Sequence, residues 1–371
     1  MRAKPWRLNK QIMTPATARD LQALPQGSRV LLAVTDRIGD SLFRTPLIRL
    51  LSSVYAGLRF EGLAFGPGAF EVLSQHPGLS RVHLASEKQE IKHLAEGFDL
   101  VINTRSSNVR RYLCQVDRPI IQHSRPAGTE HKTEDLLQFG RTLLPEPAEL
   151  SLQDRRYVLP LPDGLDERVR QRVRLETGLS SDDQVFIGLH LGCASLERYK
   201  LVFATQHLVA HKKVWPADRF ADLADQLSRS SGQRTILILG SKSESYLGRR
   251  LAQRVPQAIN LCGELTLMEM TALMDSLRLF IGNDSGPMHL ACAREIPVLG
   301  LFGPTNPKRT GPFPGLPQFR SVTASSMDKI QVEDVRLEAE SLLEHSGWLP
   351  AFHSVFLSQT QRFQQTYCNA P

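Results

Sequence analysis

The sequence lacks the features of membrane-spanning and disulfide-built proteins. No apolar run approaches the roughly 20 residues that a bilayer-crossing helix needs. The charged residues 1–7 are not followed by the apolar stretch that a secretory signal requires. Cysteine is scarce, scattered and never in a Cys-x-x-Cys pair: Cys114, Cys193, Cys262, Cys292 and Cys368. This spacing argues against a zinc knuckle or a disulfide framework and indicates reduced thiols in a cytoplasmic protein.

Low-complexity segments and short repeats are also absent, so we expect a globular chain. It has 371 residues, of which 41% are hydrophobic and 22% charged, enough for two domains with cores of their own. Prolines gather between residues 145 and 162 and mark the approach to a linker. We expect an N-terminal domain over 1–163, a C-terminal domain over 164–345 and a helical tail over 346–371.

The positive charge is concentrated in the first third of the chain. Residues 1–126 contain 18 Lys and Arg against 10 Asp and Glu, whereas residues 127–371 contain 27 against 28. Such a field suits an anionic partner of the N-terminal half, and a general solubility bias is the alternative. Because no aromatic-rich RNA-binding signature or zinc-finger spacing accompanies the charge, an anionic lipid or sugar is favoured over nucleic acid.

Short apolar runs alternate with helical patterns along the whole chain. Strands are predicted over 29–34, 58–65, 99–103, 185–190, 234–240, 279–283 and 297–302, and helices over 41–55, 216–229, 243–254, 268–276 and 287–295. This alternation is typical of an α/β fold with parallel sheets. In such folds ligands bind at the carboxyl ends of the strands.

One segment combines a strand end, a tight turn and a helix start. Asp284-Ser285-Gly286 follows the strand that ends at Asn283, and a helix begins near Pro287. The free N–H groups of a helix N-terminus attract anions, Gly286 lets a phosphate approach the backbone, and Ser285 adds a hydroxyl. His289 lies on the first turn. The alternative is an ordinary N-cap on a buried helix, with His289 as a core residue.

Three further segments carry weaker signals. Thr305 lies in a rigid loop after the next strand, where the alternative is a turn without a ligand. Lys213 precedes a helix that starts near Pro216, where its charge opposes the helix dipole unless an anion binds there; otherwise it is a solvated lysine. Asp40 follows the first strand and suits a general base, or else an N-cap for the helix expected from Ser41.

Four motifs together resemble glycosyltransferase family 9, the ADP-heptose:lipopolysaccharide heptosyltransferases. They are Arg37-Ile-Gly-Asp40 with Pro46-Leu47, Lys213-Val-Trp-Pro-Ala-Asp-Arg-Phe220, Asn283-Asp-Ser-Gly-Pro-Met-His289 and Gly303-Pro-Thr-Asn-Pro307. The resemblance implies the GT-B architecture, with two Rossmann-like α/β domains facing across a cleft. It also implies inverting, metal-independent transfer of a heptose from ADP-heptose to a lipopolysaccharide inner-core hydroxyl, without a cofactor. The protein is expected at the cytoplasmic face of the inner membrane, as a peripheral protein.

The resemblance also implies roles for individual residues. Asp40 would be the general base, and Lys213 would contact the donor phosphates. The other donor contacts would come from Asp284, Ser285, Gly286, His289, Thr305 and, at the ribose, Glu244. Arg37 and Arg105 would bind the acceptor.

The sequence also departs from the family pattern. His190-Leu-Gly-Cys193 stands for His-Pro-Gly-Ala, Asn306 replaces an aspartate, and an inserted loop covers 194–212. The changed surroundings of the donor site leave open a family-9 transferase with another nucleotide sugar. A nucleotide-sugar-binding protein without catalysis is a second alternative, and a nucleotide-sugar epimerase is a distant third.

Overall fold

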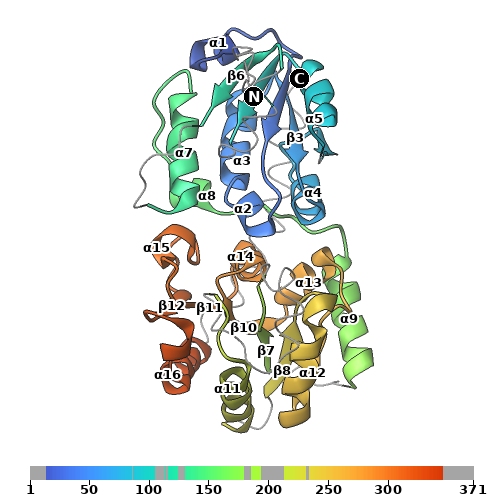
Figure 1. The fold of residues 1–371 in the computed structure, drawn as a ribbon, viewed down its shortest axis with the longest axis vertical. Coiled ribbons are helices and arrows are strands. Elements are labelled where there is room, and N and C mark those ends of the chain that lie inside the picture. The colour runs from blue at the N-terminus through green and yellow to red at the C-terminus, as the bar shows by residue number, and fades with distance from the viewer. Residues whose placement is uncertain are drawn as a thin grey trace, which may run out of the picture. The chain divides into compact units, whose positions relative to one another are not determined.

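The computed structural model describes residues 14–85, 87–104, 113, 116–123, 130–178, 185–193, 213–230 and 234–345. The chain divides into two compact units, Met1–Pro160 and Leu161–Pro371. Each unit is built on a six-stranded parallel sheet with helices on both faces (Figure 1). The expectation of two Rossmann-like α/β domains is therefore confirmed. The expected helical tail, 346–371, lies outside the described residues.

The sheet of the first unit has the strand order β1-β6-β5-β2-β3-β4. Its strands are β1 (Thr14–Pro15), β2 (Arg29–Ala33), β3 (Arg59–Ala64), β4 (Arg81–Leu84), β5 (Leu100–Asn103) and β6 (Pro119–Gln122). Its helices are α1 (Ala18–Gln22), α2 (Ile38–Leu42), α3 (Thr45–Val54), α4 (Pro67–Ser74), α5 (Lys88–Glu96), α7 (Lys132–Thr142) and α8 (Leu152–Arg155). The chain reverses direction across the sheet between β2 and β5, which makes this pair the topological switch point.

Alternate residues of these strands are buried on opposite faces of the sheet. Leu31 and Val101 share one core with Ile91 of α5. On the other face, α7 packs against α3 (Figure 1). The two helices approach so closely that a Cβ on Gly140 of α7 would lie 2.6 Å from the Leu47 side chain. Both helical layers thus bury the apolar stripes that the sequence pattern indicates.

The sheet of the second unit has the order β12-β11-β10-β7-β8-β9. Its strands are β7 (Val185–His190), β8 (Arg234–Leu239), β9 (Ala258–Asn260), β10 (Leu277–Asn283), β11 (Val298–Phe302) and β12 (Phe319–Thr323). Its helices are α9 (Leu165–Thr177), α11 (Ala217–Arg229), α12 (Ser245–Arg254), α13 (Leu267–Met274), α14 (Gly286–Ala293), α15 (Pro307–Thr310), α16 (Val332–Glu344) and the short 3-10 turns η2 (Lys242–Glu244) and η3 (Met327–Lys329). Here the switch point lies between β7 and β10.

Two helical layers cover the second sheet. Residues of α11, α12 and α16 share one large core with the strands, including Phe220, Leu251 and Val335. Both α13 and α14 contact β10, and α9 packs against α13. Because α14 follows β10 directly, its N-terminus lies at the carboxyl edge of the sheet, where the sequence predicts a ligand site.

The helix predicted over 41–55 is two helices in the structure, α2 and α3. The break lies at Pro46, which lacks the N–H that would bond the Leu42 carbonyl in a continuous helix. The Thr45 hydroxyl donates to that carbonyl instead, over 2.8 Å. Asp40 consequently lies within α2 and is not an N-cap of the helix after it.

Most of the proline-rich stretch packs on the first unit. Tyr157 and Leu159 are buried, and the Val158 N–H donates to the Thr45 hydroxyl over 2.9 Å. The Arg155 guanidinium pairs with Glu134 of α7 over 3.1 Å. The residues of this stretch therefore pack in the first unit almost as far as Pro160, where that unit ends.

The described residues include no helix that is both long and apolar enough to cross a bilayer. Three cysteines, Cys193, Cys262 and Cys292, are free and buried. Burial raises the pKa of Cys262 and of Cys292 to about 12, so these thiols stay protonated and unreactive at neutral pH. Cys114 and Cys368 lie outside the described residues.

A buried histidine links the start of α3 to the end of α4. His76 Nε2 lies 3.0 Å from the Thr45 carbonyl oxygen, and the Gly78 N–H donates to Nδ1 over 3.0 Å. This pattern requires the neutral ring with its hydrogen on Nε2. Burial lowers the pKa of His76 to about 4.

We expect the first unit to lose stability as the pH falls from 6.5 to 4. The unfolded chain binds a proton at His76 in this range and the folded unit does not, which costs about 3 kcal/mol. In His76→Asn this part of the pH dependence should disappear, whereas the exposed His93→Asn should keep it. Hydrogen exchange of α3 and α4 amides at pH 7 and 4.5 measures the effect. An unchanged pH dependence in His76→Asn would contradict the assignment.

Candidate active site

The predicted anion site lies at the switch point of the second unit. His190 ends β7 and Asn283 ends β10, and the two strands are neighbours, with His190 paired to Gly282. Strand ends on either side of a switch point leave a crevice outside the sheet. Residues 284–286 and 190–193 therefore meet at one place.

Asn283 holds the surrounding backbone segments together. It is fully buried, and its Nδ2 donates to the carbonyls of Leu191 and Gly192, at 2.9 and 3.2 Å. Its Oδ1 accepts from the Trp215 N–H over 3.0 Å. One amide thus joins the ends of β7 and β10 to the segment that carries Lys213. Because all of these groups are buried, losing the amide would leave several of them unpaired.

Lys213 and Asp284 form an ion pair at this edge. Their Nζ and Oδ2 atoms lie 2.6 Å apart, and the Asp284 side chain is only 5% exposed against 34% for Lys213. The Thr310 hydroxyl also donates to Asp284 Oδ2, over 3.4 Å. Trp215, with no exposed surface, anchors the lysine segment and donates from Nε1 to the Ile330 carbonyl over 3.1 Å. The backbone of the segment that carries Lys213 is thus fixed, and the Lys213 ammonium group stays partly exposed.

Ser285 occupies the N-cap position of α14 but makes no side-chain cap hydrogen bond. Its hydroxyl lies 3.0 Å from Nδ1 of His190 instead. Ser285 is therefore not an ordinary side-chain N-cap, which was the alternative prediction. The helix N-terminus keeps its attraction for an anion, because no side-chain oxygen of Ser285 neutralises it.

His190 in turn contacts Glu244. Its Nε2 lies 3.3 Å from Oε1 of Glu244, and both side chains are nearly buried. Oε2 of Glu244 accepts from the N–H and the hydroxyl of Ser241, each at 2.8 Å. Burial would raise the pKa of Glu244, but His190 and Ser241 outweigh it and lower this pKa to about 2. Glu244 is therefore ionised and engaged within the protein through both oxygens.

The remaining expected donor residues lie around the same strand ends. Gly286 begins α14 and His289 is buried on it. Thr305 follows β11, and its hydroxyl oxygen is buried without a hydrogen-bond partner among the described residues. Asn306 caps α15 by accepting from the Lys308 N–H over 2.9 Å. Among these, the Thr305 hydroxyl is the group whose hydrogen-bonding capacity is unmet, as expected of a ligand contact.

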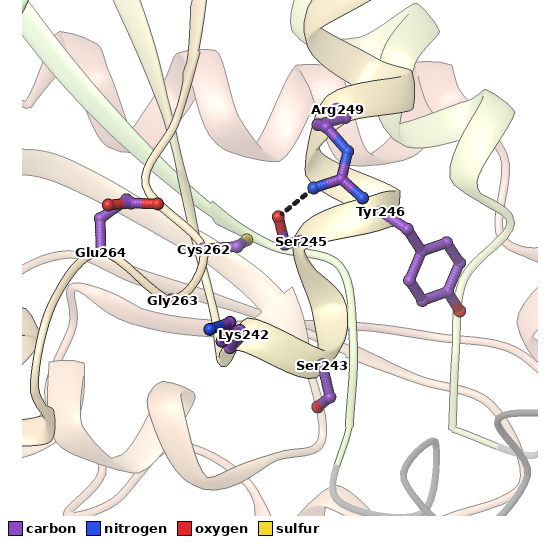
Figure 2. Close-up of a pocket in the computed structure, with 8 residues that line it drawn as sticks. All are labelled: Lys242, Ser243, Ser245, Tyr246, Arg249, Cys262, Gly263 and Glu264. Atoms are coloured by element: carbon purple, nitrogen blue, oxygen red, sulfur yellow. Dashed lines mark hydrogen bonds between the residues drawn. The ribbon is translucent and has the colours of Figure 1, made fainter.

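A cavity of about 570 Å³ lies further along the same edge. It is lined by Lys242, Ser243, Ser245, Tyr246, Arg249, Cys262, Gly263 and Glu264 (Figure 2). These residues come from η2, the first turns of α12 and the segment after β9. The Arg249 guanidinium donates to the Ser245 hydroxyl over 2.8 Å. The lining is mixed in charge and rich in hydroxyl groups, which suits a polar ligand.

In the first unit, Asp40 is surrounded by cations near the β2–β5 switch point. Lys132 Nζ lies 2.9 Å from Asp40 Oδ1, and the Asp40 side chain is 23% exposed. Arg44 donates to the Asp40 carbonyl and, from Nε and Nη2, to the Thr104 hydroxyl and carbonyl, each at 2.9 Å. Since Thr104 follows β5, these contacts join the two strand ends.

The cations keep Asp40 ionised. Burial alone would raise the pKa of Asp40, but Lys132, Arg44 and Arg37 together lower it. Arg37 is exposed at the N-cap of α2. Arg105 lies outside the described residues, as does the loop 194–212. Asp40 is thus a partly exposed carboxylate that the surrounding positive charge keeps ionised.

Lys132, Arg44 and His190 are members of these sites that were not predicted from the sequence. Lys132 is the first residue of α7, where its charge opposes the helix dipole, as at Lys213. The same signal would have found it. Within the described residues, no group of three or more His, Cys, Asp or Glu side chains is arranged to hold a metal ion.

Comparisons with known proteins agree with the two-unit fold and the motifs. A family model described as glycosyltransferase family 9 (heptosyltransferase) matches residues 91–336. Lipopolysaccharide heptosyltransferase 1 of Pseudomonas aeruginosa is 24% identical over 313 residues, covering 77% of this chain and 81% of that protein. Lipooligosaccharide heptosyltransferase 2 of Haemophilus influenzae is 32% identical over 106 residues, only 27% of this chain and 30% of that protein.

A solved structure extends the likeness to the fold. The structure of Escherichia coli ADP-heptose lipopolysaccharide heptosyltransferase II matches with a TM-score of 0.66 at 19% identity. The match covers 86% of this chain and 99% of that one. At this identity the likeness concerns the fold alone, and that fold is of the GT-B class.

Proposed function

The chain belongs to glycosyltransferase family 9, and from this premise we propose that it transfers a heptose from ADP-heptose to a hydroxyl of the lipopolysaccharide inner core. The observation that carries the proposal is the Lys213–Asp284 pair beside the uncapped N-terminus of α14. A cation and a helix N-terminus at one strand edge suit a diphosphate leaving group. The curated relatives named above are heptosyltransferases.

The proposed donor lies along the carboxyl edge of the second sheet. Its diphosphate contacts Lys213 and the turn of Ser285 and Gly286, with His289 on the first helical turn, and its sugar hydroxyls contact Asp284 and Thr305. The nucleoside extends past β7 and β8 toward the cavity around Lys242 and Tyr246. Neighbouring strands are about 4.8 Å apart, so the distance past the ends of β7 and β8 fits the length of a nucleoside.

The proposed chemistry is a single displacement. Asp40 accepts the proton of the acceptor hydroxyl as that oxygen attacks the anomeric carbon, and the bond to the diphosphate breaks on the opposite face. The configuration therefore inverts. The charge that grows on the leaving group is stabilised by Lys213 and the dipole of α14, which take the place of a divalent cation. Transfer should accordingly continue in EDTA.

The proposed acceptor is anionic, of the lipid A–Kdo type. Its carboxylates and phosphates suit the basic first third of the chain, where 18 Lys and Arg stand against 10 acidic residues over 1–126. Arg37 and Arg105 are the proposed acceptor contacts. We place the reaction at the cytoplasmic surface of the inner membrane, where such an acceptor would be presented.

A donor panel tests the proposed function. We expect purified protein, given a heptose-free lipid A–Kdo acceptor, to release nucleoside diphosphate from ADP-heptose and not from UDP- or GDP-sugars. Reaction without acceptor is the control. Release only from a UDP- or GDP-sugar would contradict the heptose assignment and favour the other-donor alternative. Binding of donors without any transfer would favour a non-catalytic binding protein.

Replacing the proposed base separates catalysis from binding. We expect Asp40→Asn to lower the transfer rate by about 10²–10⁴, the range of general-base catalysis, with ADP affinity unchanged. The matched control is Asp36→Asn, an exposed aspartate four residues earlier. Steady-state kinetics and calorimetric titration with ADP measure both. An Asp40→Asn enzyme as fast as Asp36→Asn would rule out this base.

The ion pair of Asp40 with Lys132 should affect the pH dependence of kcat/KM. Removing the cation in Lys132→Met raises the pKa of Asp40. Since the base must be ionised, the acid limb of kcat/KM should move to higher pH, with a larger loss of rate at pH 6 than at pH 8. Lys88→Met, at the exposed first position of α5, should leave the profile unchanged. A limb that stays in place or moves to lower pH in Lys132→Met contradicts the arrangement.

A further inference from the structure

The ammonium group of Lys132 is only partly used by its contacts within the described residues. One N–H donates to Asp40 Oδ1 over 2.9 Å, and the centroid of the Phe43 ring lies 5.3 Å from Nζ. The Lys132 side chain is nevertheless 35% exposed. Because an ammonium group has three N–H donors, Lys132 can still donate to an acceptor atom that approaches from the surface.

The start of α7 holds Lys132 in place. His131 is the N-cap of α7, and its Nδ1 accepts from the Thr133 N–H over 3.2 Å. The His131 ring packs edge-on against Phe43, with ring centroids 5.2 Å apart. Phe43 is buried and follows α2 directly. This packing fixes Lys132 beside α2, although its charge opposes the dipole of α7.

Positive charge exceeds negative charge around the Asp40 carboxylate. The charged side chains that act on it are Lys132, Arg44 and Arg37, and each is a cation. Arg37 is exposed and forms no ion pair within the described part of the chain. Even with the exposed Asp36 counted, the cations outnumber the carboxylates. Such an excess favours an anionic ligand at this place.

The two oxygens of the Asp40 carboxylate differ in their contacts. Oδ1 accepts from Lys132, whereas Oδ2 has no hydrogen-bond partner among the described residues. Oδ2 is therefore the atom at which an acceptor hydroxyl can bind. With hydrogen bonds of about 2.8 Å, an anion on Lys132 lies roughly 5–8 Å from that hydroxyl oxygen. Two groups at this separation fit on one sugar residue.

We propose that Lys132 binds a carboxylate carried by the same sugar residue as the attacked hydroxyl, and that it thereby selects an acidic acceptor sugar. This inference rests on the proposed function for the role of Asp40. It adds an acceptor contact to Arg37 and Arg105. It also places the recognised charge next to the reacting oxygen, apart from the phosphates of the lipid.

This contact offsets a disadvantage of the surrounding cations. By lowering the pKa of Asp40, the cations weaken it as a base. A carboxylate bound to Lys132 adds negative charge beside Asp40 and raises the pKa of Asp40 again. An acidic sugar thus strengthens the base in the complex in which the base acts, and a neutral sugar does not.

Transfer to a matched pair of acceptors tests the contact. The pair is lipid A–Kdo and its Kdo methyl ester, and both are assayed at pH 8, where Asp40 is ionised. We expect esterification to lower kcat/KM of the wild type about tenfold, the effect of a hydrogen bond between charged groups. In Lys132→Met the loss should be less than about twofold. Lys88→Met, at the exposed first position of α5, should lose as much as the wild type.

A third acceptor separates the sugar carboxylate from the lipid A phosphates. Dephosphorylated lipid A–Kdo should lower kcat/KM by the same factor in the wild type and in Lys132→Met. A phosphate effect that disappears in Lys132→Met would overturn this inference alone. The same holds for a wild type that uses ester and acid equally well, or for an ester effect as large in Lys132→Met as in the wild type. If the wild type transfers no heptose to lipid A–Kdo, the proposed function and this inference fail together.

Discussion

The ion pair between Lys213 and Asp284 is the contact on which the second unit's site depends. It holds a cation beside a helix N-terminus, where helix stability alone would disfavour it. The Asp284 carboxylate is nearly buried, so it needs a charged partner, and removing the lysine would leave it uncompensated. Asn283 fixes the geometry by binding the Trp215 N–H and the carbonyls after β7. The fold thus maintains a positive charge at the place where a leaving diphosphate would develop negative charge.

The first unit contains a similar pair of a lysine and an aspartate, in which the carboxylate is more exposed. Lys132 pairs with Asp40 as Lys213 pairs with Asp284, and both pairs lie near a switch point of a parallel sheet. The carboxylates differ in exposure, at 23% for Asp40 and 5% for Asp284. A carboxylate that must exchange a proton with substrate needs access, whereas one whose main part is to hold a lysine needs less. The difference in burial therefore matches the two proposed roles.

Several elements of this arrangement were predictable from the sequence, and others were not. The turn 284–286 and the strands before it follow from local apolar runs and from the turn residues, which act over short separations. Lys132 and Asp40 are 92 residues apart, so only the folded sheet brings them together. The split of the helix predicted over 41–55 follows from Pro46, which stands where a hydrogen bond to the Leu42 carbonyl would be needed. The His190–Glu244 contact was not predicted, because the sequence does not show that Gly192 leaves space for the carboxylate.

The role of the Lys213 cation is tested most directly by the transfer rate of Lys213→Met with ADP-heptose and the core acceptor. We expect a loss of about 10²–10³ in kcat, the effect of removing one preorganised charge or donor from the transition state. Lys308→Met, an exposed lysine on α15, should keep the wild-type rate, and circular dichroism should show both variants folded at the assay temperature. A folded Lys213→Met enzyme with the kcat of Lys308→Met would contradict the claim that this cation stabilises the departing diphosphate.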